Sequence, residues 1–141
     1  MTLKNLCNAI SQLAINEKII NFATAGTSLY SLNPKNIENY PVLFSSPTGN
    51  HIVTENTTTY AVTLFYFDRL SEGDENNLDI YSAAVEQLKT LVRKIETLEG
   101  VLKVEDNYYI TNFADTETFD DRLAGAWCEI KIVTNNLFLC D

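Results

Sequence analysis

The pattern of apolar and polar residues predicts two amphipathic helices. Apolar residues recur at helical spacing between residues 3 and 16, with Asn and Gln opposite, and Thr2 is the expected N-cap. After a polar turn, a longer set recurs at steps of three and four up to about Leu98, and Gly100 is the expected stop. The apolar faces comprise Leu3, Leu6, Cys7, Ile10, Leu13 and Ala14 in the first helix, and Tyr81, Val85, Leu88, Val92 and Ile95 in the second.

The longest apolar run, Thr59–Phe67, predicts a strand that is buried on both faces, because large apolar residues occur at odd and even positions alike. Such a strand lies centrally in a sheet that is covered, at least in part, on both sides. The second helix supplies one cover. Further strands are predicted at Ile19–Leu32 (one strand or a bent pair, with Gly26 at a bulge or turn), Val42–Phe44, His51–Thr54, Tyr108–Phe113 and Ala126–Val133.

The order of these elements predicts the fold class. The strands are grouped between helices, and the turns between them look too short for parallel crossovers. We therefore expect an α+β fold in a single domain of 141 residues. Its mainly antiparallel sheet of about five strands accompanies an N-terminal helix and one long central helix.

The composition of the chain argues against several classes of function. The net charge is −9, and the ten Lys and Arg residues are scattered, which argues against a nucleic-acid surface. Cys7, Cys128, Cys140 and the single histidine, His51, lack metal-ligand spacing, so we expect reduced thiols, with Cys7 and Cys128 in the core. No apolar run approaches the roughly 18 residues that span a bilayer, and the N-terminus lacks signal-peptide features. We expect no membrane partner.

The acidic group before the second helix, Asp74, Glu75 and Asp79, lacks the ligand order of an EF-hand calcium loop. A metal site is the alternative to a simpler role at the helix N-terminus. There the carboxylates favour the positive end of the helix, and Asn76 or Asn77 is the N-cap.

A second acidic group, Asp115, Glu117, Asp120 and Asp121, is either a solvated loop or a set of carboxylates for acid–base chemistry. Neither a phosphate-binding loop nor a Ser-His-Asp set accompanies it, and His51 follows a Pro-Gly turn. We therefore expect no enzymatic activity and no cofactor.

Three segments carry a resemblance to a known family. They are Tyr40–Phe44 after the first helix and strand, the apolar strand into Asp68-Arg69-Leu70 with the helix entry Asn77–Ser82, and the acidic loop before Ala124-Gly125-Ala126-Trp127. In order and spacing they resemble small tail-terminator and tail-completion ring proteins of tailed bacteriophages, including ring proteins of crassvirus-type tails.

The resemblance implies a structural virion protein in the phage tail or at the head–tail junction, present in the host cytoplasm during assembly. Such proteins form closed homo-oligomeric rings, commonly hexamers or multiples of them, against neighbouring tail, connector or portal proteins. Genomic DNA passes through the lumen without specific binding. The family has no catalytic residues to transfer to this chain.

Three parts of the chain are candidates for subunit contacts in such a ring. Asp68 is expected to accept hydrogen bonds from the following turn, and Arg69 to pair with a carboxylate of its own chain or of a neighbour. His51 and Thr57 lie in a polar segment, Ser45–Thr59, that is suited to reaching a neighbour. Phe138 belongs to the apolar tail Leu137–Cys140, which docks on its own sheet or on a partner.

Two other functions remain open at this point. One is a soluble α+β adaptor module that binds a peptide along an exposed sheet edge. The other is a small hydrolase that uses Asp115, Asp120 and Asp121.

Overall fold

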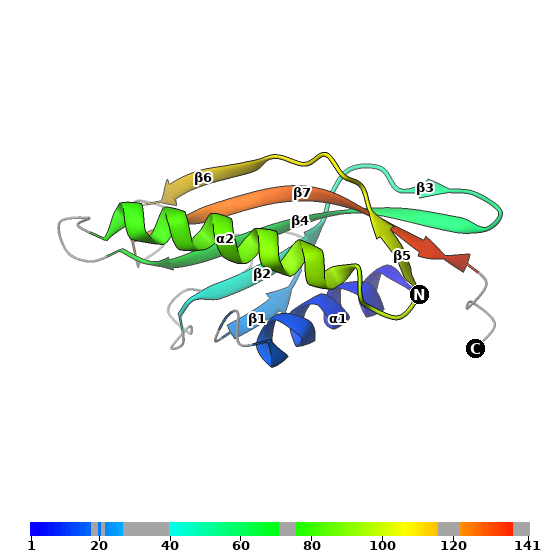
Figure 1. Cartoon of the computed structure of the whole chain (residues 1–141), viewed down its shortest axis with the longest axis horizontal. Coiled ribbons are helices and arrows are strands. Elements are labelled where there is room, and N and C mark those ends of the chain that lie inside the picture. Colours follow the sequence, from blue (N-terminus) through cyan, green and yellow to red (C-terminus); the bar gives the residue numbers. More distant parts are fainter. Residues whose placement is uncertain (18–19, 21, 27–39, 71–75, 116–121, 137–141) are drawn as a thin grey trace.

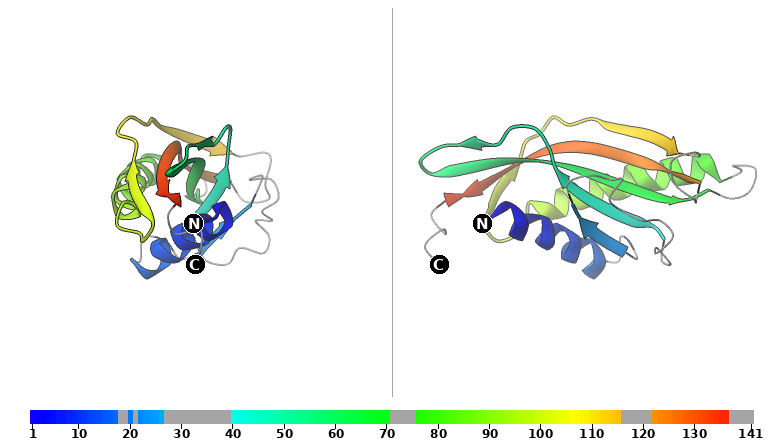
Figure 2. Two further views of the ribbon diagram at one scale, coloured as in Figure 1. Left: turned by 90° about the vertical axis from the view of Figure 1, so that its right-hand side faces the viewer. Right: turned by 180° about the vertical axis from the view of Figure 1, so that it is seen from behind.

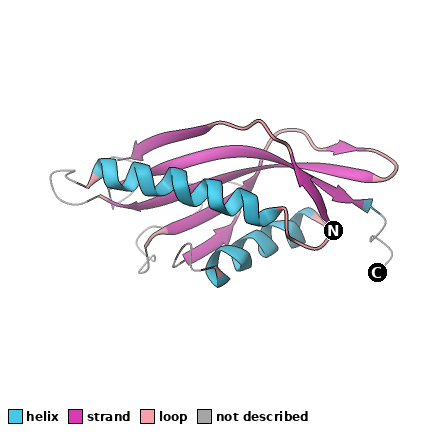
Figure 3. Ribbon diagram, in the orientation of Figure 1, coloured by secondary structure: helices cyan, strands magenta, loops and turns pink. Residues whose placement is uncertain are grey.

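The computed structural model describes residues 1–17, 20, 22–26, 40–70, 76–115 and 122–136. In this part of the chain, two helices pack on one face of a seven-stranded sheet (Figure 1; Figure 3). The elements in chain order are α1 (Leu3–Asn16), β1 (Phe22–Ala25), β2 (Val42–Pro47), β3 (Ile52–Val53), β4 (Thr57–Arg69), α2 (Asn77–Ile95), β5 (Val101–Val104), β6 (Ile110–Asp115) and β7 (Leu123–Asn135).

The sheet is built around two long strands. β4 and β7 are antiparallel and pair along their whole length, from Thr57 opposite Asn135 to Arg69 opposite Leu123. The path across the sheet is β1-β2-β4-β7-β5, with β3 on β4 and β6 on β7. All pairings except β1–β2 are antiparallel. The predicted α+β class with a mainly antiparallel sheet is therefore confirmed.

The main core lies between the helices and one face of the sheet. Side chains from β2, β4 and β7 alternate toward this face, as the period of two requires. Leu6 and Ile10 of α1, and Leu88 and Leu91 of α2, are fully buried against them. The sheet residues of this cluster are Leu43, Val62, Leu64, Tyr66, Ala126, Cys128, Ile130 and Ile132.

The opposite face of the sheet, which the right-hand view of Figure 2 shows from behind, carries a second apolar cluster. Phe44 and Phe67 are buried there, and the half-buried Phe65 lies between aromatic neighbours. Its ring centroid is 6.4 Å from that of Phe113 and 6.5 Å from that of Trp127. The prediction of a central strand apolar on both faces is thus confirmed for β4.

The N-terminal helix agrees with its prediction. α1 spans Leu3–Asn16, and the Thr2 hydroxyl accepts a 3.1 Å hydrogen bond from the backbone N–H of Asn5. The second helix ends at Ile95, short of the predicted Leu98. Asn76 occupies its N-cap position without capping through its side chain, which instead donates a 3.3 Å hydrogen bond to the Arg69 carbonyl.

The strand count was predicted too low, chiefly because β5 was missed. Its apolar residues Val101 and Val104 do not alternate, since the register against β7 shifts between Val101 and Lys103. An irregularity of this kind destroys the period of two on which strand prediction depends.

The expectation that every connection is too short for a parallel crossover was also wrong. The chain between Ala25 and Val42 exceeds the dozen or so residues that a parallel crossover needs, and β1 and β2 are parallel. Of the predicted strand Ile19–Leu32, the structure describes Ile20 and residues 22–26, within which β1 is the strand. Gly26 extends the ladder by a 3.0 Å hydrogen bond to the Ser45 carbonyl, and residues 27–39 lie outside the described residues.

Candidate functional site

The predicted contact residues lie at opposite ends of the sheet. Thr57 begins β4 and His51 bonds to Ala61 further along it, whereas Asp68 and Arg69 end the same strand. At roughly 3.3 Å per residue, Thr57 and Arg69 lie about 40 Å apart, and His51 lies between these two ends of the strand. Phe138 and the rest of the apolar tail lie outside the described residues. The structure therefore splits the four described residues into two sites.

Asp68 and Arg69 form local contacts. The Asp68 carboxylate accepts a 2.7 Å hydrogen bond from the backbone N–H of Arg69, its neighbour in β4. Residues 71–75 of the turn from which a bond was expected lie outside the described residues. The Arg69 guanidinium lies 5.0 Å from the centroid of the Tyr40 ring, in cation–π geometry. Burial and then the nearby Asp68 carboxylate raise the pKa of Tyr66 to about 12. Asp68 and Arg69 thus end β4 in register with Ala124 and Leu123 of β7.

The β3–β4 hairpin is the most prominent feature at the other end. It projects beyond both helices (Figure 1). The predicted short strand within His51–Thr54 is confirmed as β3, and its two residues are apolar yet exposed: Ile52 by 53% and Val53 by 72%. Because opposite residues of an antiparallel pair share a face, Val53 lies on the face of Thr58 and Ile52 on that of Thr59.

Side-chain hydrogen bonds hold the hairpin turn. The Thr54 hydroxyl accepts from the Thr57 N–H at 3.0 Å and lies 2.8 Å from the Thr57 hydroxyl. Asn136 links the two sides: it accepts from the Thr58 hydroxyl at 2.7 Å and donates to the Thr54 carbonyl at 3.1 Å. The hairpin is therefore ordered by contacts within one chain.

His51 binds a backbone N–H group of β4 at the point where the pairing of β2 with β4 ends. The Thr48 N–H still donates to the Ala61 carbonyl at 3.0 Å, and the Ala61 N–H then donates to Nδ1 of His51 at 3.2 Å. The imidazole ring packs edge-on against Tyr60, with 5.5 Å between ring centroids. These contacts give His51 a structural role at the base of the hairpin.

A groove runs between α1 and β1. It consists of two adjoining hollows of about 480 and 350 Å³, which share Asn8 and Ala25. The first hollow is mainly apolar and also contacts Leu3, Cys7 and Pro47; Lys4 lies at the same end. Sequence reasoning missed this groove, because it depends on how α1 sits beside an edge strand.

Only some members of the two acidic groups lie among the described residues. Asp115 ends β6 and Asp79 is exposed in the first turn of α2, whereas Asp74, Glu75, Glu117, Asp120 and Asp121 lie outside the described residues. Among the described residues, no group of three or more His, Cys, Asp or Glu side chains could hold a metal ion.

The described cysteines are core residues, as predicted. Cys7 and Cys128 are free and buried, whereas Cys140 lies outside the described residues. Burial raises the pKa of both described thiols, that of Cys128 to about 12. Both thiols are therefore protonated at neutral pH.

Compared with known protein families and with curated proteins, the chain matches none. Neither helix in the described part of the chain is both long and apolar enough to cross a bilayer. Function is therefore inferred from the geometry of the described residues and from the resemblance in sequence.

Proposed function

We propose that this chain is a structural virion protein that forms a homo-oligomeric ring in the tail, or at the head–tail junction, of a tailed bacteriophage. The ring is a hexamer or a multiple of it, acts as a tail terminator or connector, and performs no catalysis. The observation that carries the proposal is the ordered β3–β4 hairpin, which projects from the body and exposes Ile52 and Val53.

An exposed pair of this kind favours association. Burying an Ile or Val side chain contributes roughly 1.5–3 kcal/mol, and here two such side chains are adjacent. Thr54, Thr57 and Asn136 hold the hairpin before any partner arrives. Association therefore loses little conformational entropy, which improves affinity.

The positions of the contact residues favour a ring over a twofold dimer. The hairpin extends from one end of β4 and the groove lies between α1 and β1, so one copy presents two unlike surfaces. A contact between unlike surfaces is head-to-tail, and it closes into a ring when the rotation per subunit divides the circle.

The charge of the chain is compatible with a lumen through which DNA moves. With a net charge of −9, the surface repels phosphates and does not hold them by counterion release. Neighbouring tail, connector or portal proteins would complete the assembly, in the virion and, before that, in the host cytoplasm.

The ring is tested by light scattering after size-exclusion chromatography and by negative-stain microscopy, with and without particle partners. We expect a discrete ring. Val53→Asp should weaken it, because a charge replaces a contact side chain, whereas Leu102→Asp should not, because Leu102 is similarly exposed (55%) but lies in β5. A chain that stays monomeric at high concentration and is missing from purified particles would overturn the proposal.

A second candidate function is the adaptor module that binds a peptide at a sheet edge. It is favoured by β6, which pairs with β7 and with no other strand in the described part of the chain. A six-residue edge offers backbone groups for strand addition. A monomer whose amide signals at Ile110–Asp115 shift on binding one peptide would favour this function over the ring.

A further inference from the structure

We propose that the β3–β4 hairpin of one copy lies in the groove between α1 and β1 of the next copy. This contact rests on the proposed ring and names the two surfaces that join its subunits. The two features are unlike each other and are present once in each chain, as a head-to-tail contact requires.

The groove has the form of a site for an extended segment. One wall is a stripe along α1, in which Leu3, Cys7 and Ser11 recur at steps of four. The other wall is β1 and Gly26, where small side chains leave space. In the described part of the chain, β1 pairs with β2 alone, and the proposed contact adds a further strand at its other edge.

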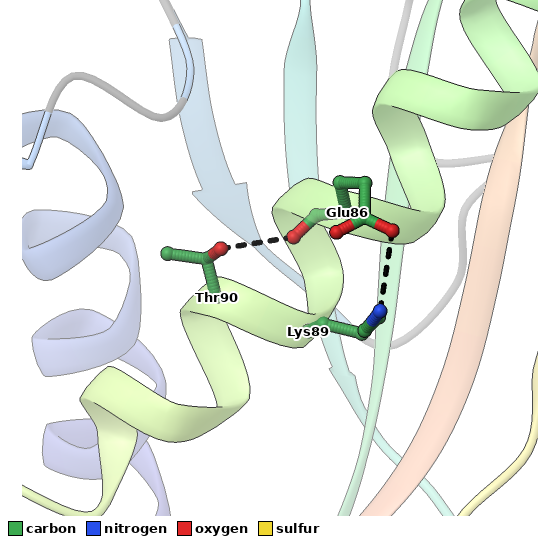
Figure 4. A network of polar contacts seen from close by, with 3 residues as sticks. All are labelled: Glu86, Lys89 and Thr90. Carbon is green, nitrogen blue, oxygen red and sulfur yellow. Dashed lines mark hydrogen bonds and ion pairs between the residues drawn. The ribbon is translucent and has the colours of Figure 1, made fainter.

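The outer surface of α1 is unusually poor in charge. Between Leu3 and Asn16, Lys4 is the single charged residue, and the exposed positions include Asn8, Gln12 and Ile15. α2 differs, because its exposed surface carries charges such as the Glu86–Lys89 ion pair at 3.2 Å; Thr90 also donates to the Glu86 carbonyl (Figure 4). Depletion of charge is typical of the centre of a protein–protein contact.

The hairpin supplies a complementary occupant. β3 is extended, pairs with β4 alone in the described part of the chain, and carries exposed Ile52 and Val53 on opposite sides. Either side chain can therefore face Leu3 and Cys7 of α1 while the backbone of β3 lies along the edge of β1.

Charge complementarity favours a second copy of this chain as the occupant of the groove. Glu55 is exposed in the hairpin turn, and Lys4 is exposed at the apolar end of the groove. Neither residue has an ion-pair partner in the described part of its own chain. The hairpin cannot meet its own groove, because its ladder to β4 and its bonds to Asn136 direct it away from α1. A neighbouring copy can bring Glu55 and Lys4 together.

Disulfide trapping tests the contact directly. Val53→Cys and Asn8→Cys are combined in one chain, in a Cys140→Ser background, and the protein is oxidised gently. We expect a non-reducing gel to show a ladder of linked subunits up to the full ring. The matched control combines Leu102→Cys with Asn8→Cys and should give no ladder, since Leu102 is outside the contact.

Charge reversal gives a second readout. Lys4→Glu and Glu55→Lys should each weaken association about fivefold at low salt, whereas the double variant should recover most of the loss. Glu129→Lys, an exposed charge in the middle of β7 opposite Thr63 of β4, is the control.

The two tests separate this contact from the ring itself. A ring of normal mass that gives no ladder and no recovery in the double variant would overturn the contact and leave the ring proposal standing. A chain that stays monomeric at every concentration, with partners present, would overturn both.

Discussion

The hydroxyl group of Thr58 donates a 2.7 Å hydrogen bond to the side-chain carbonyl oxygen of Asn136, 78 residues further along the chain. The same Asn136 side chain donates to the Thr54 carbonyl, so one residue holds both strands of the projecting hairpin. The order of the hairpin thus depends on a residue just beyond the end of β7.

Replacing Asn136 by Ala should loosen the hairpin. Loss of both bonds is expected to lower the free energy of unfolding by about 1–3 kcal/mol. Amide hydrogen exchange at residues 54–58 should accelerate more than exchange in the centre of β4. Asn107→Ala, at an exposed position, is the control. Unchanged exchange in the Asn136→Ala variant would show that the turn orders itself without this residue.

Gly125 cannot carry a side chain. A Cβ atom there would lie 1.8 Å from the Tyr66 carbonyl oxygen and 2.7 Å from Cα of Phe67, both in the backbone of β4. Gly125→Ala must therefore push the two longest strands apart, and we expect a loss of at least about 3 kcal/mol of stability. The change is measured by chemical denaturation, or by loss of soluble protein.

Gly49→Ala provides the comparison for this prediction. Its Cβ would meet nothing within 4 Å, but the backbone φ of +66° disfavours an L-residue by about 1–2 kcal/mol. If Gly125→Ala proved as mild as Gly49→Ala, the close approach of β7 to β4 would be wrong.

His51 closes a gap in the edge of β4. Because its Nδ1 accepts from the Ala61 N–H, His51→Ala should remove that acceptor and lower stability by about 0.5–1.5 kcal/mol. His51→Asn keeps a side-chain acceptor and should lose less. Hydrogen exchange at Ala61 distinguishes this role from a general effect on stability. Protection that survives in His51→Ala would contradict it.

Much of the fold was predictable where one local rule acts alone. The period of α1 and its Thr2 cap depend on neighbours within four residues, and the two-sided apolar run of β4 reports burial on both faces of a sheet. β5 was not predicted because its register shifts against β7. The parallel pairing of β1 with β2 was not predicted because it depends on how the chain between them crosses over. The spacing of apolar residues along the sequence indicates neither property.

The candidate sites were harder to predict than the fold. The short strand at Ile52–Val53 was foreseen, but its exposure was not, because an apolar pair in sequence ordinarily indicates burial. The groove between α1 and β1 arises from segments brought together by packing. Asp68 and Arg69 looked like a break after β4, yet they continue its ladder opposite β7.

Stability at alkaline pH should depend on Cys128. Burial raises the pKa of its thiol from the ordinary 9.0 to about 12. Between these values the unfolded chain has lost the thiol proton and the folded protein keeps it. The folded state then binds more protons, so the free energy of unfolding falls as pH rises from 9 to 12. One such group lowers it by at most about 1.4 kcal/mol per pH unit.

Cys128→Ala isolates this contribution. The cavity left by the sulfur lowers stability at every pH alike, so the difference in slope with pH reports the thiol alone. Urea unfolding at about pH 8 and about pH 10.5 should show a larger loss in the wild-type protein than in Cys128→Ala. Tyr66, with its pKa raised to about 12, keeps its own contribution in both proteins. Equal losses in the two proteins would mean that Cys128 reaches solvent in the folded state.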